Sequence, residues 1–328
     1  MYTFEETKLI AAIKERKSKR ILLQLPEGLK KEGFRLSSYI QEHTKTEVIL
    51  SGEPCWGACD VAINEAKALK ADLIVLYGHA PFFAADFPIL YLEARYEKDI
   101  TSLMKQSAGI LKDYGRVGVV SSVQHLHHLP LARDLFEKKG KTVVIPGKKG
   151  HAFYDGQVLG CEYNGLKTIV HDVDAFLVIA NKFHALGAAL ALQKPVYSLD
   201  PFNEEIESME PLKQAIIKQR FATIEKAKKA EIFGVLIGLK PGQTFGSFDL
   251  VKKKLEDMGK KYALITMREV TPDKLINLYD IDAFIELACP RIAIEDVTRY
   301  PKAVLTLKEF LVLSGELTWE QLLESGFL

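Results

Sequence analysis

One short landmark recurs three times along this chain, at wide and similar intervals. Each copy is an aspartate followed by a run of apolar residues, within segments 71–75, 173–177 and 281–285. Seven residues after the aspartates stand, in order, His79, Asn181 and Cys289. Self-similarity at a regular period is typical of duplicated structural units. The landmark therefore predicts that the chain folds as three copies of one unit.

Strand-like runs that are apolar on both faces alternate with helical stretches throughout the sequence. This alternation is typical of a parallel sheet covered by helices on both sides. The first strand-like run of each repeat lies at 20–26, 116–121 and 232–237, and follows amphipathic helical stretches at 4–16, 100–112 and 212–229. We therefore predict an α/β fold of three similar parallel-sheet units, spanning residues 1–96, 97–203 and 204–328.

Composition is that of an ordinary globular protein. The 328 residues are 48% hydrophobic and 27% charged, with a formal net charge of +1. So small a net charge creates no field that would draw the chain onto nucleic acid or a membrane surface. The acidic start at residues 1–6 does not resemble a signal peptide, and no apolar run reaches the roughly 20 residues needed to span a bilayer. We expect a cytoplasmic protein with no direct nucleic-acid or membrane partner.

Of the 4 cysteines, Cys59, Cys161 and Cys289 each follow a strand-like run in a different predicted unit. Loops at the carboxyl ends of parallel strands form the ligand crevice of such sheets. Three units in a pseudo-three-fold arrangement, with their crevices turned inward, would bring the trio together. Three thiolates on a four-iron cluster would leave one iron open for a substrate. The alternative is a set of Rossmann-like units in which these cysteines only fill core space.

Cys55 lies four residues before Cys59, and no Cys-x-x-Cys motif occurs in the chain. It could be a bystander, or a fourth or substitute ligand. Cys59 is preferred because its context, a small residue before and an acidic residue after, repeats around Cys161. Small neighbours let backbone N–H groups approach a sulfide or phosphate closely.

Other loop residues have side chains suited to binding. Glu27 and Gly28 follow the first strand of unit one, and the segment 238–243, which contains Lys240, takes the same place in unit three. A glycine-rich loop with a lysine can hold a carboxylate or phosphate. Neither a Walker motif nor Gly-x-Gly-x-x-Gly is present, so nucleotide triphosphate binding has weak support. Side chains that could also meet a carboxylate are Lys182, His184 and Arg291.

Three histidines, His125, His127 and His128, follow the first strand of unit two. Histidine clusters can bind zinc, but no cysteine or carboxylate with zinc-site spacing lies nearby in the sequence. We favour a role for one of them in the crevice wall or as a proton donor.

The ordered set of motifs resembles the enzymes of the first step of archaeal diphthamide biosynthesis, the 2-(3-amino-3-carboxypropyl)histidine synthases. The resemblance covers essentially the whole chain. Its motifs are Pro-Glu-Gly at 26–28, Trp-Gly-Ala-Cys-Asp at 56–60, Tyr-Gly-His at 77–79, Leu-Gly-Cys at 159–161, Lys-Phe-His at 182–184, Gly-Leu-Lys-Pro-Gly-Gln at 238–243 and Ala-Cys-Pro-Arg at 288–291. Trp56 stands where relatives often have tyrosine, which leaves the cysteine assignment intact.

The resemblance implies three α/β domains around a [4Fe–4S] cluster with Cys59, Cys161 and Cys289 as ligands. It also implies S-adenosylmethionine as co-substrate, a histidine of translation elongation factor 2 as acceptor, a homodimer and an external electron donor. The residues we expect to contact the cluster or S-adenosylmethionine, besides the cysteines, are Glu27, Gly28, His79, Lys182, His184, Gly238, Lys240, Gly242, Gln243 and Arg291.

The family is understood to break the bond between the sulfur and the methionine γ-carbon. The released 3-amino-3-carboxypropyl radical adds to imidazole C2 of the target histidine and leaves methylthioadenosine. The Cys-x3-Cys-x2-Cys motif of ordinary radical S-adenosylmethionine enzymes is incomplete here, because position 62 is Ala62. Lys240 and Arg291 are our candidates for holding the methionine carboxylate.

Three other functions remain open from the sequence. Quinolinate synthase resembles three α/β units around a three-cysteine cluster, but it is a Lewis-acid dehydratase without S-adenosylmethionine. Its clustered Gly-Cys-x-Cys-Pro element is absent here. A non-catalytic subunit of a diphthamide complex is disfavoured by the presence of all three cysteines. A nucleotide binder is disfavoured because no dinucleotide fingerprint follows any strand.

Overall fold

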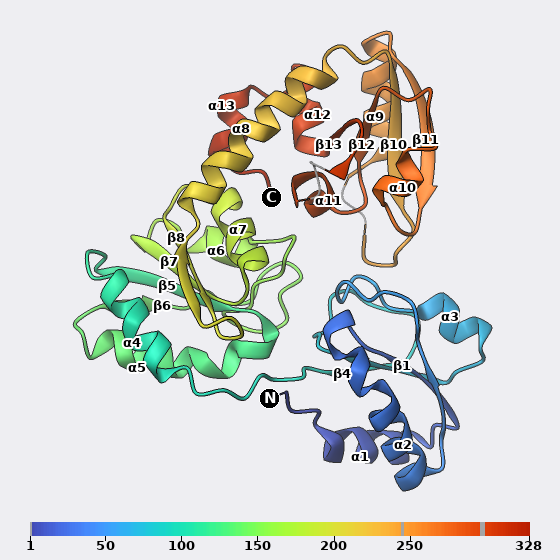
Figure 1. Cartoon of the computed structure of the whole chain (residues 1–328), viewed down its shortest axis with the longest axis vertical. Helices are drawn as coiled ribbons and strands as arrows, with labels where there is room; N and C mark the ends of the chain where they lie inside the picture. The colour runs from blue at the N-terminus through green and yellow to red at the C-terminus, as the bar shows by residue number, and fades with distance from the viewer. Residues whose placement is uncertain (1, 244–245, 296–298) are drawn as a thin grey trace.

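The computed structural model describes residues 2–243, 246–295 and 299–328. Three separate sheets organise this part of the chain, in the orders β2-β1-β3-β4, β6-β5-β7-β8-β9 and β11-β10-β12-β13. Figure 1 shows them at the corners of a triangle, with the long helix α8 along the side between the second and third sheets. The predicted fold of three similar α/β units is confirmed, while the exact unit boundaries stay predictions.

The first unit is a four-stranded parallel sheet with its first strand in the interior. Its strands are β1 (Arg20–Gln24), β2 (Glu47–Leu50), β3 (Leu73–Tyr77) and β4 (Ile89–Leu92). Its helices are α1 (Glu6–Arg16), the 3-10 helix η1 (Glu27–Glu32), α2 (Gly33–Thr44) and α3 (Ile63–Ala68).

The second unit repeats this order and adds one antiparallel edge strand. Its strands are β5 (Arg116–Ser121), β6 (Thr142–Val144), β7 (Ala175–Ile179), β8 (Val196–Asp200) and β9 (Glu205–Ser208). Its helices are α4 (Thr101–Ile110), the 3-10 helix η2 (Val123–His128), α5 (Leu129–Glu137), α6 (Asn164–Thr168) and α7 (Lys182–Ala191). Strand β9 pairs with β8 and so lies in the second sheet, just beyond the boundary predicted at residue 204.

The third unit is again parallel and four-stranded. Its strands are β10 (Ile232–Gly238), β11 (Lys261–Met267), β12 (Ala283–Glu286) and β13 (Ala303–Thr306). Its helices are α8 (Glu210–Ala227), α9 (Phe248–Asp257), α10 (Pro272–Leu275), α11 (Pro290–Glu295), α12 (Leu307–Leu313) and α13 (Trp319–Ser325).

The repeated aspartate has the same structural role in every unit. Its carboxylate accepts a backbone N–H at the start of the unit's first strand. Asp72 accepts from Lys19 at 2.7 Å, Asp174 from Arg116 at 2.7 Å and Asp282 from Ile232 at 2.9 Å. This bond joins the first and third strands in sequence of each unit, which explains why the landmark recurs.

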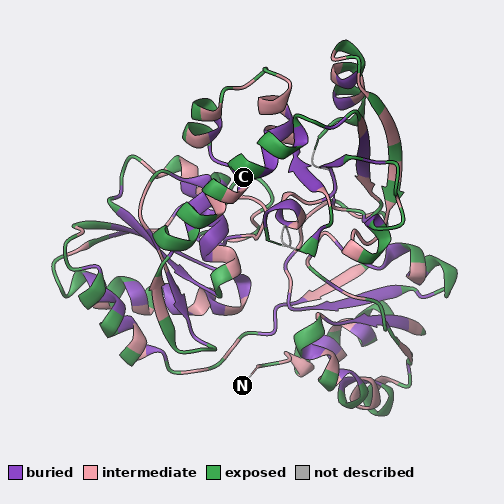
Figure 2. Cartoon of the chain, turned by 45° about the horizontal axis from the view of Figure 1, so that its top comes forward, coloured by how far each residue is buried: buried purple, intermediate pink, exposed green. Residues whose placement is uncertain are grey.

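The cores lie between the sheets and their helices. Figure 2 shows buried strands in each unit and helices whose outer faces are exposed. In the third unit, for example, Phe233 of β10 and Phe310 of α12 are both fully buried. Among the described residues, no helix combines the length and the apolar character needed to cross a membrane.

Candidate functional site

The three wide-spaced cysteines lie in loops that follow parallel strands. Cys59 is in the loop between β2 and α3, Cys161 in the loop between β6 and α6, and Cys289 between β12 and α11. All three are partly buried free thiols. Cys55 is different, because it is only 2% exposed and packs in the apolar core of the first unit with residues such as Leu22 and Ile74. The structure thus places Cys55 as a core residue.

The three thiols are near enough to one another for their charges to interact. Burial raises the pKa of Cys161, and the thiolates of Cys289 and Cys59 raise it further. Burial also raises the pKa of Cys289 to about 11, with the Cys59 charge adding to the effect. Thiols that resist ionisation together need a cation or a cationic cluster to hold them as thiolates. Three soft sulfur donors from three units suit an iron–sulfur cluster.

The loop after β10, in the third unit, binds the backbone of Cys59 in the first unit. The N–H of Gly242 donates to the carbonyl of Cys59 at 2.9 Å. A Cβ at Gly242 would lie 2.6 Å from the Cα of Cys59, so only glycine allows this approach. The side-chain amide of Gln243 donates to the Sγ of Cys59 at 3.7 Å. Gly242 and Gln243, both predicted site residues, therefore meet a predicted ligand directly.

Lys240 bridges the first and third units through a buried ion pair with Asp60, and it also pairs with the partly buried Glu269. Its Nζ lies 2.8 Å from Asp60 and 2.6 Å from Glu269. Glu269 in turn accepts a hydrogen bond from the indole N–H of Trp56 at 3.2 Å. Burial alone would lower the pKa of Lys240, but its hydrogen bonds to Asp60 and Glu269 raise it above the ordinary value. Lys240 therefore links the third unit to the first by an ion pair next to Cys59.

Arg291 has buried N–H donors without a protein acceptor. It is only 4% exposed, and its guanidinium lies over the ring of Phe183 at 4.1 Å from the centroid. Its Nη2 donates to the carbonyl of Phe183 at 2.7 Å and pairs with Glu295. Nε and Nη1 have no hydrogen-bond partner in the described part of the chain. Unpaired buried donors are costly, so these two N–H groups indicate a missing anionic partner.

The predicted site residue His184 lies near this guanidinium, and the predicted His79 lies near His184. The Nδ1 of His184 is 2.8 Å from the side-chain oxygen of Asn181, and the Nδ1 of His79 is 3.0 Å from the carbonyl of Tyr77. Burial lowers the pKa of each histidine to about 4, and for His184 the charges of Arg291 and His79 lower it further. Both imidazoles are thus neutral at physiological pH. His184 thus interacts with the landmark residues after β3 and β7, His79 and Asn181.

Four other predicted residues have packing contacts, surface ion pairs or open space around them, and their role in binding stays a prediction. Lys182 pairs with Glu205 at 3.4 Å and Glu207 at 2.9 Å. Glu27 pairs with Lys30 at 2.6 Å on the surface. A Cβ at Gly238 would lie 2.5 Å from the Cβ of Ala288, so glycine at this position lets β10 pack closely against the end of β12. A Cβ at Gly28 would meet nothing within 4 Å.

The histidine cluster lies on η2, directly after β5. His125 and His128 are 8% and 7% exposed, and the rings of His127 and His128 lie 3.9 Å apart. Burial, then neighbouring histidines, lower the pKa of His125 to about 3 and that of His128 to about 4. The residues that the structure describes contain no group of three or more His, Cys, Asp or Glu that could hold a single metal ion.

Glu286 is a site residue that the sequence reasoning missed. It ends β12, is 1% exposed, and accepts the backbone N–H of Cys289 at 2.8 Å and that of Ala288. Burial raises the pKa of Glu286 to about 7, although these two N–H bonds oppose the shift. A single carboxylate at the end of an otherwise apolar strand was the available signal. Glu286 fixes the backbone that presents Cys289.

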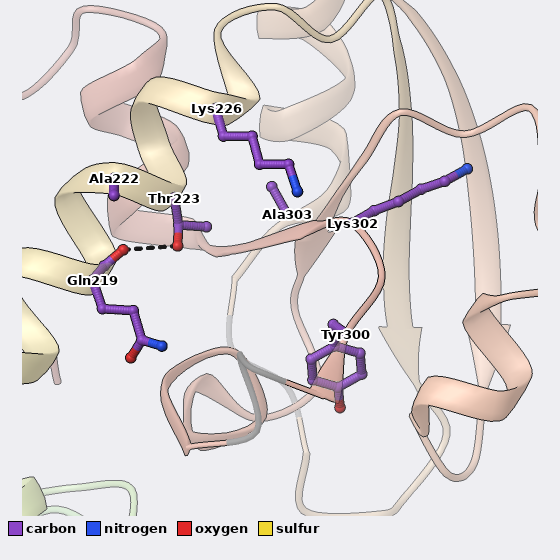
Figure 3. A pocket seen from close by; sticks show the side chains of 7 residues that line it. All are labelled: Gln219, Ala222, Thr223, Lys226, Tyr300, Lys302 and Ala303. Atoms are coloured by element: carbon purple, nitrogen blue, oxygen red, sulfur yellow. Dashed lines mark hydrogen bonds between the residues drawn. The ribbon is translucent and has the colours of Figure 1, made fainter.

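A separate cavity of about 220 Å³ lies between α8 and β13. Figure 3 shows its lining, where the hydroxyl of Thr223 donates to the carbonyl of Gln219 at 2.9 Å. Its lining residues are Gln219, Ala222, Thr223, Lys226, Tyr300, Lys302 and Ala303. It includes none of the predicted site residues, so it is distinct from the cysteine site.

Comparison with known proteins places this geometry in a family. Residues 25–323 match the family model described as diphthamide synthesis protein. The 2-(3-amino-3-carboxypropyl)histidine synthase of Pyrococcus horikoshii is 32% identical over 318 residues, which cover 96% of this chain and 91% of that protein. Subunit 1 of the human enzyme of the same name is 28% identical over 330 residues, covering 98% of this chain and 74% of the human protein.

The fold agrees with a solved structure of the same family. The crystal structure of Dph2 from Pyrococcus horikoshii with a 4Fe-4S cluster superposes with a TM-score of 0.89 at 30% identity. The match covers 99% of this chain and 95% of that one. Sequence, fold and the convergence of the three cysteine loops therefore agree, and the chain belongs to the diphthamide synthesis protein family.

Proposed function

We propose that this protein catalyses the first step of diphthamide biosynthesis. It transfers the 3-amino-3-carboxypropyl group of S-adenosylmethionine to imidazole C2 of a histidine in translation elongation factor 2, leaving methylthioadenosine. The observation that carries the proposal is the convergence of Cys59, Cys161 and Cys289, one from each unit, within electrostatic reach of one another. Relatives named as synthases of this modified histidine support the same reaction.

The proposed ligands of the cluster are the thiolates of Cys59, Cys161 and Cys289. When bound, a [4Fe–4S] cluster with three protein ligands supplies an electron and one open iron. The protein's contribution is to position and enclose the reactants. Glu286 orders the backbone at Cys289, and Gly242 with Lys240 holds the Cys59 loop.

Arg291 is the better placed of the two candidates for the methionine carboxylate. Its Nε and Nη1 are buried and lack a hydrogen-bond acceptor among the described residues. Each of these two nitrogens can donate a charge-assisted hydrogen bond to a carboxylate oxygen. Lys240 already has Asp60 and Glu269 as partners, so we assign it to positioning the Cys59 loop. The neutral imidazoles of His79 and His184 would line the same region.

The reaction also requires partners. We propose that the protein acts in the cytoplasm as a homodimer, receives its electron from a separate donor, and binds elongation factor 2 as its protein substrate. The family relationship supports these assignments.

The test is the fate of S-adenosylmethionine on the anaerobically purified and dithionite-reduced protein. Methylthioadenosine as the nucleoside product would support cleavage at the γ-carbon. A protein that holds iron and sulfide but leaves S-adenosylmethionine intact would contradict the proposal and favour the dehydratase alternative. Deoxyadenosine would identify ordinary radical chemistry and would also contradict it. An R291M variant should bind S-adenosylmethionine more weakly than the wild type. The control K228M changes a surface residue at the end of α8 and should keep the wild-type affinity.

A further inference from the structure

The side-chain amide of Gln243 has an unusual acceptor. Its Nε2 lies 3.7 Å from the Sγ of Cys59, a thiol in another unit of the fold. Gln243 itself is only 8% exposed, so water competes little for this amide. The backbone holds the residue in place, because its N–H donates to the carbonyl of Lys240 at 3.1 Å and the neighbouring Gly242 binds Cys59.

The other two cysteines have different surroundings. The Sγ of Cys289 accepts a backbone N–H from Arg291, and burial with neighbouring charges dominates the pKa of Cys161. In the ranges 2–243, 246–295 and 299–328, no side chain other than that of Gln243 donates a hydrogen bond to one of the three proposed ligand sulfurs. The sulfurs of the three cysteines therefore have unequal surroundings. Cys59 differs from the other two because its sulfur accepts a hydrogen bond from a side chain, which a substitution can remove.

We infer that the amide of Gln243 donates to the Cys59 thiolate of the bound cluster and raises the cluster's reduction potential. The inference rests on the proposed cluster. Hydrogen bonds to cluster sulfurs are among the factors that set the potential of iron–sulfur proteins. Reduction adds negative charge that is shared with the ligand sulfurs. An N–H dipole aimed at one of them therefore stabilises the reduced state more than the oxidised state.

The effect on the redox equilibrium is large enough to measure. A hydrogen bond to a charged group is stronger than one between neutral groups. We expect removal of the bond to change the ratio of reduced to oxidised cluster about tenfold at a fixed potential. For a one-electron couple this equals a shift of about 59 mV.

Gln24, the last residue of β1, provides a matched control that binds the same loop. Its Nε2 donates to the carbonyl of Asp60 at 2.7 Å, and its Oε1 accepts the N–H of Ala62 at 3.0 Å. It is 1% exposed. Gln24 thus supports the backbone next to Cys59 from within the first unit, whereas its amide is bonded to backbone and not to sulfur. A variant at Gln24 disturbs the loop but leaves the N–H to sulfur bond in place.

The experiment is a redox titration followed by electron paramagnetic resonance on anaerobically reconstituted wild type, Q243L, Q243E and Q24L. At the wild-type midpoint, Q243L should show a ratio of reduced to oxidised cluster about tenfold below that of the wild type. Q243E keeps the shape of the side chain and places a carboxylate oxygen near the sulfur, so its potential should fall at least as far. Q24L should lose iron on dilution more readily while its remaining cluster keeps the wild-type potential.

Each contrary result has a distinct meaning. Equal potentials in wild type, Q243L and Q243E would overturn the inference while leaving the proposed function intact. An equal fall in Q24L and Q243L would also overturn it, because the shift would then come from general disturbance of the loop. A wild-type chain that takes up no iron or sulfide would overturn the inference together with the proposed function. Measuring Q243E beside Q243L keeps the test decisive if the leucine variant fails to assemble.

Discussion

The ammonium of Lys240 lies 2.8 Å from a carboxylate oxygen of Asp60, the residue directly after Cys59. The two side chains come from the third and first units and are 3% and 1% exposed. Glu269 completes the arrangement at 2.6 Å from the same ammonium. The loop that carries one proposed cluster ligand is therefore fixed by a buried charge in another unit.

Removing this charge should destabilise the fold. We expect K240M to lower the free energy of unfolding by about 3 kcal/mol, because loss of one partner leaves a buried carboxylate uncompensated. Chemical denaturation of the cluster-free protein measures the change. K228M is the matched control, since Lys228 pairs with Glu225 on the surface, where both side chains are about half exposed. Its cost should stay below about 0.5 kcal/mol.

A double variant makes the same prediction more specific. In K240M with D60N the buried carboxylate charge of Asp60 is removed as well, while Glu269 keeps its charge, so the double change should cost less than the sum of the single changes by about 1 kcal/mol or more. If the two single changes in the free energy of unfolding simply add up in the double variant, Lys240 and Asp60 do not interact, and the proposed link between the units is refuted.

The cysteines should separate cleanly by function. C59A, C161A and C289A should each lose most of the iron and sulfide retained after anaerobic reconstitution, because each removes one of three proposed ligands. C55A should keep the wild-type iron content, since Cys55 is 2% exposed among apolar residues of the first unit. Metal analysis and the visible absorption spectrum provide the measurement. Full iron retention by C161A, or complete loss in C55A, would refute the ligand assignment.

A side chain added at Gly242 should disturb the cluster, because Gly242 lies close to the backbone of Cys59. A methyl group there would lie 2.6 Å from the Cα of Cys59, which is backbone that cannot move without shifting the ligand. We expect G242A to lower the cluster content several-fold and to increase the rate of cluster loss. G109A in α4, where an added Cβ meets nothing within 4 Å, is the control and should leave cluster content unchanged. Equal cluster content in the two variants would argue against the loop contact.

Acid should destabilise the protein through its buried histidines. Burial lowers the pKa of His125 to about 3 and that of His128 to about 4, whereas both titrate near 6.5 when unfolded. Between about pH 6.5 and 4 the unfolded chain binds protons that the folded chain does not, so stability falls as pH falls. Each histidine contributes up to about 1.4 kcal/mol per pH unit.

The measurement is the free energy of unfolding at pH 7 and pH 5, by denaturant titration. A variant with H125N and H128N should lose less stability over this range than the wild type. H43N removes an exposed histidine of α2 and should keep the wild-type difference. Glu286 acts in the opposite sense, since its raised pKa of about 7 makes stability fall as pH rises from about 4.5, but it is one group against four, because burial also lowers the pKa of His79 and His184 to about 4. An unchanged difference in the double histidine variant would refute this prediction.

The sequence predicted the three units because each repeats the same local tie. Asp72 and Asp282 both accept backbone N–H groups at the start of a first strand, so the chemistry that holds the unit is visible as a recurring residue. The partly buried trio of cysteines followed from the same logic. The three cysteines follow the parallel strands β2, β6 and β12, and parallel strands present their carboxyl-end loops at one edge of a sheet.

Contacts between units could not be predicted in the same way. Lys240 and Asp60 lie far apart in the sequence, and nothing in either segment shows which residue the ammonium meets. The same holds for Lys182, whose role in binding a carboxylate ligand stays a prediction, since its pairs with Glu205 and Glu207 depend on how β9 packs beside it. The direction of a side chain at a contact between units depends on how the whole units pack. A local sequence pattern does not encode that packing.

The most direct test of the proposed function follows the transferred group itself. Reduced protein is given elongation factor 2 and S-adenosylmethionine labelled with carbon-13 in its aminocarboxypropyl carbons, and the factor is analysed by mass spectrometry. We predict that one histidine of the factor gains the labelled group, with one methylthioadenosine formed for each modified histidine. A factor in which this histidine is replaced should gain no label. An unlabelled factor after incubation with protein that carries an intact, reduced cluster would contradict the proposed reaction.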